Sequence, residues 1–127
     1  MKKEIVVTAI LKSGDNFLLV KRSVFEDKYA GMWEFPGGHV EKQEKICDAI
    51  KRELKEELNL ELNTNFNLIG YSDELDNNVY TLELDFLVYV DKDKIKISLS
   101  DEHSEYKWVL KDSPLMDDYI KNKIKNI

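Results

Sequence analysis

The sequence is short of several features that would place it outside ordinary globular proteins. Among its 127 residues only Cys47 is a cysteine, so an internal disulfide is impossible and a cytoplasmic location is expected. No stretch approaches the ~20 apolar residues of a membrane span. Residues 1–4 lead into a strand-like run rather than a signal peptide. We therefore expect no membrane partner.

An excess of positive charge is also lacking. The chain has 25 acidic and 19 basic side chains, which gives a formal net charge of -6. Binding along a nucleic-acid backbone needs a basic surface, so a nucleic-acid polymer is not expected as a partner. A small nucleotide is compatible with this charge, because a bound metal ion neutralises phosphates locally.

What the chain does have is enough apolar material for one core. Hydrophobic residues make up 43% of the sequence, which argues against disorder. A chain of this length buries a core without disulfides. Since neither a repeat nor a low-complexity linker divides it, we expect residues 1–127 to form a single domain.

Short apolar runs alternate with turn signals along most of the chain. β-Branched and aromatic residues predict strands, which we place at residues 5–11, 17–20, 33–35, 66–71, 79–90 and 106–110. Turns are expected at 13–16, where the first two strands would form a hairpin, and at 72–78, with a loop at 24–32. This mixture predicts an α/β (α+β) fold.

Two segments have the pattern of helices, at 44–58 and about 114–125. For the second, Ser113 is the expected N-cap and Pro114 the first helical residue. Two helices among these strands predict a mixed sheet covered by helices on both faces.

The first helix carries glutamates on its apolar side. At 100° per residue, the buried stripe is formed by Ile46, Ala49, Ile50, Leu54 and Leu58. Glu57 lies about 20° and Glu53 about -20° from Ile46, inside this stripe, while Glu56 lies on its edge at about -80°.

A solvated acidic face does not account for Glu53 and Glu57, because such a face would lie opposite the stripe. An ion pair with Arg52 is available to Glu56 but is harder to form for the other two. Neighbouring carboxylates repel one another, and a hard divalent cation would relieve that repulsion. The helix therefore predicts a site for Mg²⁺, Mn²⁺ or Ca²⁺.

A glycine pair precedes this helix. Gly37 and Gly38 follow Pro36, and paired glycines let a ligand approach the main chain closely. The exposed N–H and C=O groups of such a loop can contact phosphate or metal. A Gly-Gly pair alone usually indicates only a turn. Here it precedes the acidic helix directly, and this position is what suggests a binding site.

Together these residues resemble the Nudix hydrolase family. That family's motif places a glycine and a glutamate before an Arg-Glu-aliphatic-any-Glu-Glu run, which a glycine and an aliphatic residue close. Residues 38–60 match it at Gly38, Glu44, Arg52, Glu53, Leu54, Glu56, Glu57 and Leu60. Asn59 stands where the family has its second glycine. Asparagine is the next-best residue for the left-handed cap of a helix, so this departure touches no chemistry.

The surroundings resemble the MutT-like branch of that family. The similar segments are residues 17–22, 33–38 and 101–109, so the resemblance spans about 5–112. It implies the Nudix α/β/α sandwich with a mixed β-sheet, and hydrolysis of a nucleoside diphosphate linked to another group.

The resemblance also implies roles for particular residues. Mg²⁺, or Mn²⁺ in its place, would be held by the Gly37 carbonyl and by Glu53, Glu56, Glu57 and Glu102. These four glutamates would be the catalytic residues, with Glu53 or else Glu102 activating the attacking water.

Other positions would bind substrate or support the site. Arg22 would pair with phosphate, while Glu34, Phe35, Gly37 and Gly38 would line the substrate site.

Glu44 and Arg52 would have supporting roles. The roles of His39 and His103 stay open between surface or substrate contacts and direct catalysis. Asp117 and Asp118 are either readers of the base or part of an exposed helix turn.

The substrate itself stays open at this point. A nucleoside triphosphate, including an oxidised one, is favoured because residues 1–4 leave little room for the N-terminal strands common in ADP-ribose hydrolases of the family. The alternatives are ADP-ribose or sugar nucleotides, dinucleoside polyphosphates, prenyl-diphosphate isomerisation, and a sensor that binds without hydrolysis. Sensors usually lose glutamates of the motif, whereas this chain keeps them all. A monomer and a homodimer are equally compatible with the sequence.

Overall fold

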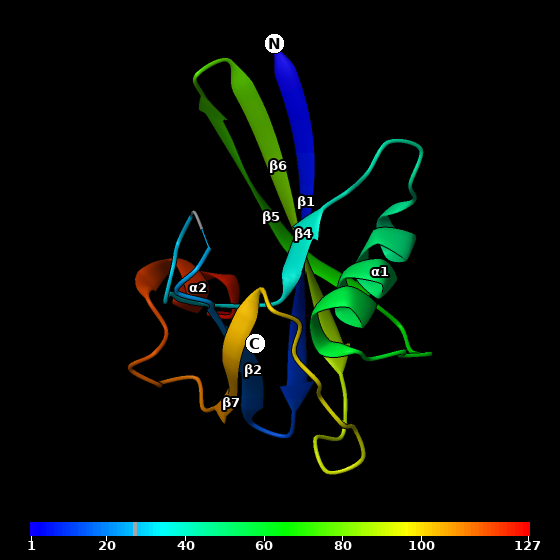
Figure 1. Ribbon diagram of the computed structural model, residues 1–127, viewed down its shortest axis with the longest axis vertical. Helices are drawn as coiled ribbons and strands as arrows, with labels where there is room; N and C mark the ends of the chain where they lie inside the picture. The colour runs from blue at the N-terminus through cyan, green and yellow to red at the C-terminus, as the bar shows by residue number, and fades with distance from the viewer. Residues whose placement is uncertain (27) are drawn as a thin grey trace.

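A computed structural model describes residues 1–26 and 28–127 of the chain (Figure 1). Its elements, in order, are β1 (Lys2–Ser13), β2 (Asn16–Arg22), β3 (Trp33–Glu34), β4 (Gly37–His39), α1 (Ile46–Leu58), β5 (Asn67–Asp76), β6 (Val79–Tyr89), β7 (His103–Val109) and α2 (Asp118–Lys123). The loop predicted at 24–32 includes residue 27, which lies outside the described residues.

The strands form one mixed sheet around β1. The order is β3-β2-β1-β6-β5, with β4 paired to β1 and β7 paired to β2. β1 runs parallel to β6, and the other pairs are antiparallel. The predicted hairpin is confirmed, since Ser13 pairs with Asn16 across the first turn. The parallel β1–β6 pair joins strands far apart in sequence, which brings the centre of the sheet together from both halves of the chain.

The two helices pack on opposite faces of this sheet (Figure 1). Successive side chains of a strand point to opposite faces, and β2 shows the consequence. Leu18 and Val20 join the core beneath α1, while Phe17 and Leu19 join the core beneath α2. The predicted α/β/α sandwich is therefore confirmed.

α1 has the predicted apolar stripe, and its C-terminal end is capped as the sequence indicated. Asn59 adopts the left-handed conformation, with φ 54 and ψ 37. Its N–H donates to the Lys55 carbonyl at 3.0 Å, and the N–H of Leu60 donates to the Leu54 carbonyl at 3.2 Å. These bonds satisfy carbonyls that the end of a helix leaves unpaired. The helix begins at Ile46, two residues later than predicted, because Glu44 belongs to a separate turn: Gln43 before it is left-handed, with φ 60, and the N–H of Glu44 donates to the Glu41 carbonyl.

The C-terminal helix differs from the prediction. It is short, Asp118–Lys123, and its N-cap is Asp117, whose carboxylate accepts from the N–H of Ile120 at 2.9 Å. The predicted cap, Ser113, accepts from the N–H of Leu115 at 3.2 Å and so closes a separate turn. Serine side chains compete for nearby backbone groups in this way, and Ser113 therefore ends up outside the helix.

Two further segments were predicted to be a turn and a loop, but the structure shows both as parts of strands. Residues 72–76 continue β5, and only Asn77 and Asn78 form the turn, with φ of 48 and 62. Asparagine tolerates this left-handed backbone, so two residues suffice to join β5 and β6. Gly37 and Gly38, expected in a loop, lie in β4 and pair with β1. In the described part of the chain, neither helix is long and apolar enough to cross a membrane.

Candidate metal centre and active site

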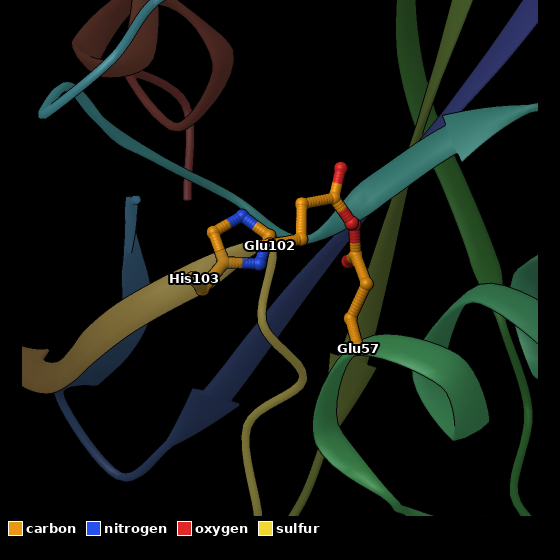
Figure 2. Close-up of side chains that lie close together, drawn as sticks. All are labelled: Glu57, Glu102 and His103. Atoms are coloured by element: carbon orange, nitrogen blue, oxygen red, sulfur yellow. The ribbon is translucent and has the colours of Figure 1, made fainter. Parts of the chain in front are cut away.

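The candidate site lies where α1, the first residue of β4 and the start of β7 meet. Glu57, Glu102 and His103 each place a ligand atom within 4.8 Å of the others. Figure 2 shows Glu57 extending from α1 toward the carboxylate of Glu102, with His103 beside it at the beginning of β7. The fold thus brings Glu57 of the acidic helix next to Glu102 and His103, which lie far from it in the sequence.

Glu57 is the most buried carboxylate of this group, with 2% of its surface exposed. Its Oε2 accepts a hydrogen bond from the N–H of Gly37 at 3.0 Å. Burial, together with the charges of Glu102 and Glu53, raises the pKa of Glu57 to about 10. A carboxylate in this position needs a positive charge, and among the described residues Glu57 has no ion pair.

Glu53 lies beside β4, and the two glycines of β4 are explained by what surrounds them. A Cβ on Gly38 would lie 2.4 Å from Oε1 of Glu53, and a Cβ on Gly37 would lie 2.1 Å from the Val7 carbonyl oxygen. The glycines therefore let the backbone approach the Glu53 carboxylate on one side and β1 on the other. Burial raises the pKa of Glu53, although Arg52 opposes the shift.

Arg52 holds several acidic side chains on the outer side of α1. Its guanidinium donates to Glu44 at 2.8 Å, to Glu53 at 2.9 Å and to Glu56 at 3.2 Å. It also donates to the second oxygen of Glu44 at 3.0 Å and to the His39 carbonyl at 2.8 Å. From the sequence, an ion pair with Arg52 was expected for Glu56 and not for Glu53. In the structure Arg52 pairs with both. Glu56 stays 57% exposed and lies outside the cluster of Glu57 and Glu102.

Arg22, expected to contact phosphate, is surrounded by carboxylates. It donates to Glu102 at 3.1 Å, to Glu26 at 3.3 Å and to Glu34 at 3.5 Å. Burial alone would lower the pKa of Arg22, but the charges of Glu34 and Glu102 raise it. One guanidinium therefore connects the strand β2 to the carboxylate of Glu102. Phe35 is buried in the core beneath α2.

His103 belongs to the same network and is fully buried. Its Nε2 lies 2.7 Å from Oε2 of Glu34, and its Nδ1 has no hydrogen-bond partner among the described residues. Of the alternatives that the sequence left open for His103, the structure therefore excludes a surface position. His39, by contrast, is exposed and contacts Glu4 at 3.2 Å.

A second polar cluster lies on the α2 side of the sheet, and sequence reasoning missed it. The ammonium of Lys123 is buried between Glu83 and Asp85, 2.7 Å from an oxygen of each. The hydroxyl of Thr8 donates to Glu83 at 2.9 Å, and the hydroxyl of Tyr119 donates to the same carboxylate. Glu83 and Asp85 alternate with apolar residues in β6, and their position in a strand was the available signal.

The residues of the main site fit a hard divalent cation. Two of the three clustered groups are carboxylates, whose oxygens suit magnesium, manganese or calcium better than zinc, and His103 adds an imidazole nitrogen. Glu57 is buried beside Glu102 and close to Glu53, so the three carboxylates repel one another. Arg52 pairs with Glu53 and Arg22 with Glu102, but among the described residues Glu57 has no ion pair. A divalent ion would remove this mutual repulsion.

The comparison with known proteins identifies the class of the chain. The model of the NUDIX domain matches residues 2–125, so the chain belongs to the Nudix family. Nudix enzymes are hydrolases of nucleoside diphosphate derivatives that generally use a divalent metal and bind small nucleotides.

Particular relatives lie at low sequence identity. The "Nucleoside triphosphatase NudI" of Escherichia coli O17:K52:H18 is 26% identical over 117 residues, covering 86% of this chain and 83% of the relative. The MutT protein of Methanosarcina mazei Go1 superimposes with a TM-score of 0.82 at 25% identity, covering 98% of this chain and 91% of that one. The NUDIX domain of Shewanella oneidensis NrtR, solved with ADP ribose, shares the fold with a TM-score of 0.68 at 19% identity, covering 87% and 74%.

Proposed function

We propose that residues 1–127 form a single Nudix domain that hydrolyses a nucleoside triphosphate to the monophosphate and pyrophosphate, with Mg²⁺ or Mn²⁺ as cofactor. The observation that carries this proposal is the buried Glu57 carboxylate facing Glu102, next to the backbone of Gly37. The similarity to a nucleoside triphosphatase supports the choice of substrate. We place the enzyme in the cytoplasm, where the exposed thiol of Cys47 stays reduced.

The proposed ligands are the Gly37 carbonyl and the carboxylates of Glu53, Glu56, Glu57 and Glu102. When bound, a divalent ion neutralises phosphate charge and makes water more acidic. Glu57 is already positioned for this role by its bond from the N–H of Gly37. Glu56 would have to leave Arg52, and its exposure leaves it free to rotate.

The chain itself orients the attacking water and accepts its proton. Glu53 is one candidate base, because it is half-buried beside Gly38 and held by Arg52. Glu102 is the other, because it lies between Glu57 and Arg22. In either case one P–O bond forms from water, one P–O bond of the anhydride breaks, and the proton passes to the carboxylate. Positioning and charge supply the catalysis, since phosphoryl transfer leaves the protein little covalent chemistry.

Substrate contacts come from the strands next to this centre. We propose that Arg22 pairs with a phosphate group, exchanging its contacts with Glu26 and Glu102 for the substrate. Glu34 keeps its bonds to Arg22 and His103 and so holds the guanidinium in place. With the two glycines of β4 and the backbone of Phe35, whose side chain is buried in the core beneath α2, these residues line the proposed substrate site. Asp117 is already used as the cap of α2, which leaves Asp118 the freer candidate for contact with a base.

The experiment that tests this function is a product assay with Mg²⁺ and a panel of nucleotides. The panel holds canonical and oxidised triphosphates, ADP-ribose, nucleotide sugars and dinucleoside polyphosphates. We expect pyrophosphate and monophosphate from a triphosphate, and no turnover in excess chelator. A kcat/KM for ADP-ribose or a nucleotide sugar at least roughly tenfold above every triphosphate would refute the substrate, while leaving the reaction class intact.

A pair of variants tests the site. Glu57→Gln removes the buried charge and should lower kcat by several orders of magnitude, as expected for a lost metal ligand. Glu61→Gln is the matched control, because Glu61 is exposed and pairs with Lys55 outside the site. Retention of most activity in Glu57→Gln would show that the metal assignment is wrong.

A further inference from the structure

The far ends of β1, β5 and β6 extend beyond both helices as a three-stranded projection (Figure 1). The pairing registers give the rows of this projection. From the end inward, the rows that share one face are Lys3–Tyr80–Leu75, Ile5–Leu82–Asp73 and Val7–Leu84–Tyr71. Leu84 packs against the core beneath α1, so this face is continuous with the α1 side of the sheet.

The two faces of the projection differ sharply in composition. On the α1 side, all nine positions of these rows are apolar or aromatic except Lys3 and Asp73. The positions between them point to the opposite face, and they are Lys2, Glu4, Val6, Ser72, Glu74, Asp76, Val79, Thr81 and Glu83. That face is mostly polar, as expected for a sheet surface in water.

The outer part of this apolar face is nevertheless exposed, whereas Val7 is buried in the core and Leu84 packs against it. Tyr71 is 70% exposed, Leu75 66% and Ile5 38%. Scattered apolar residues on a surface need no explanation, but a contiguous patch with a polar reverse side marks a surface that is covered by a partner. The strand alternation is maintained to the end of the projection, where α1 no longer covers it.

We propose that a second copy of this chain covers this face, so that the protein forms a homodimer through the α1 side of its projecting sheet. The charges on the face favour a second copy. Lys3 and Asp73 have opposite signs, so the face is neutral although the chain carries -6 overall. In a two-fold contact each copy presents the same patch, and Lys3 of one copy can pair with Asp73 of the other. A strongly charged partner would find no complementary charge here.

The edge of β5 offers a different contact that would leave this face bare. β5 is at the end of the strand order, so its outer backbone groups are available to another strand. Pairing at a sheet edge is made by backbone hydrogen bonds, so it does not depend on which face of the sheet carries the apolar side chains. The apolar face, rather than the edge, is what the sequence pattern distinguishes, and we therefore assign the contact to the face. Because few residues take part, we expect a weak dimer with a dissociation constant on the order of micromolar.

Neighbouring residues of β5 give a matched test. Tyr71 points to the apolar face, whereas Ser72 is exposed on the polar face of the same strand. Light scattering and sedimentation across roughly a hundredfold range of concentration should show monomer turning into dimer for the native chain. Tyr71→Glu should weaken the dimer by about a hundredfold, because it places like charges across the contact. Ser72→Glu adds the same charge on the other face and should leave the dimer unchanged.

A charge exchange tests the pairing of Lys3 with Asp73. Lys3→Asp and Asp73→Lys should each weaken the dimer, and the double variant should restore it. Asp73 also accepts a hydrogen bond from Tyr80 at 2.9 Å, which the double variant does not restore, so recovery can come only from the pairing between copies. Circular dichroism shows that each variant is folded.

Two results would overturn the proposal. A chain that stays monomeric at every concentration has no homodimer, and its apolar face then belongs to another partner. Equal loss of the dimer in Tyr71→Glu and Ser72→Glu would place the contact at the β5 edge. Neither result bears on hydrolysis, because the projection lies apart from Glu57 and Glu102.

Discussion

Replacing Glu57 with glutamine should make the metal-free protein more stable at pH 7. Glu57 is buried beside Glu53 and Glu102, and its pKa is raised mainly by burial. Glutamine has nearly the same shape and keeps an oxygen that can accept the N–H of Gly37. The substitution therefore replaces a group that must take up a proton on folding at pH 7 with one that is always neutral, and it retains the hydrogen bond.

The size of this effect follows from proton linkage. A carboxyl with an ordinary value of 4.5 whose pKa is raised in the folded state holds its proton more tightly there than in the unfolded chain. Stability is then greatest below pH 4.5 and falls by about 1.4 kcal/mol per pH unit above it, until the folded-state pKa is passed. Because part of the raised pKa of Glu57 comes from the charges of neighbouring carboxylates, we expect about 2 kcal/mol at pH 7 rather than the full amount.

The assay is chemical denaturation in excess chelator between pH 4 and pH 8, roughly the range in which small proteins remain folded. The native chain and Glu57→Gln should agree at the acidic end and diverge as the pH rises, with the variant more stable. Added Mg²⁺ should then reverse the order, because a cation stabilises only the protein that binds it. A variant that is less stable than the native chain in chelator at pH 7 would refute the reasoning, and Glu61→Gln shows the effect of the same substitution at an exposed position.

Three other substitutions have expected outcomes. Asn59→Gly should be neutral or slightly stabilising and Asn59→Val should destabilise by about 1 kcal/mol or more, because the residue is left-handed; equal urea midpoints for the two would contradict the cap. Gly38→Ala places a methyl group on the Glu53 carboxylate and should lower kcat by roughly a hundredfold while KM changes less; unchanged steady-state kinetics would show that Glu53 is free to move. Lys123→Met leaves two carboxylates of β6 buried without their cation and should destabilise the fold by about 3 kcal/mol in denaturant titrations, whereas a gain in stability would mean that the ion pair contributes nothing.

The features that depend on local periodicity could be predicted from the sequence. The turn angle of a helix placed Glu57 inside the apolar stripe, and the structure buries it there. Asn59 was predicted to end α1, and it does so in the expected conformation. Each of these predictions needs only residues within one helix, where spacing along the chain fixes position in space.

The features that depend on contacts between distant segments could not be predicted from the sequence. His103 and Glu34 lie 69 residues apart, and no local pattern indicates that one hydrogen bond joins them. Lys123 reaches Asp85 from a helix whose true start, at Asp118, depended on which of two side chains capped it. The strand β4 was missed for a related reason, because two glycines carry no strand preference and pair only where β1 provides a partner.

The separation of the two cores has a consequence for how such an enzyme can change. β1 and β2 supply alternate side chains to two layers that meet only at the backbone of the sheet. A substitution that reshapes the α2 layer, such as one near Lys123, leaves the packing beneath α1 and the position of Glu57 as they are. We therefore expect that substitutions can change the binding surface on the α2 side of the sheet without disturbing the packing of α1 on the other side.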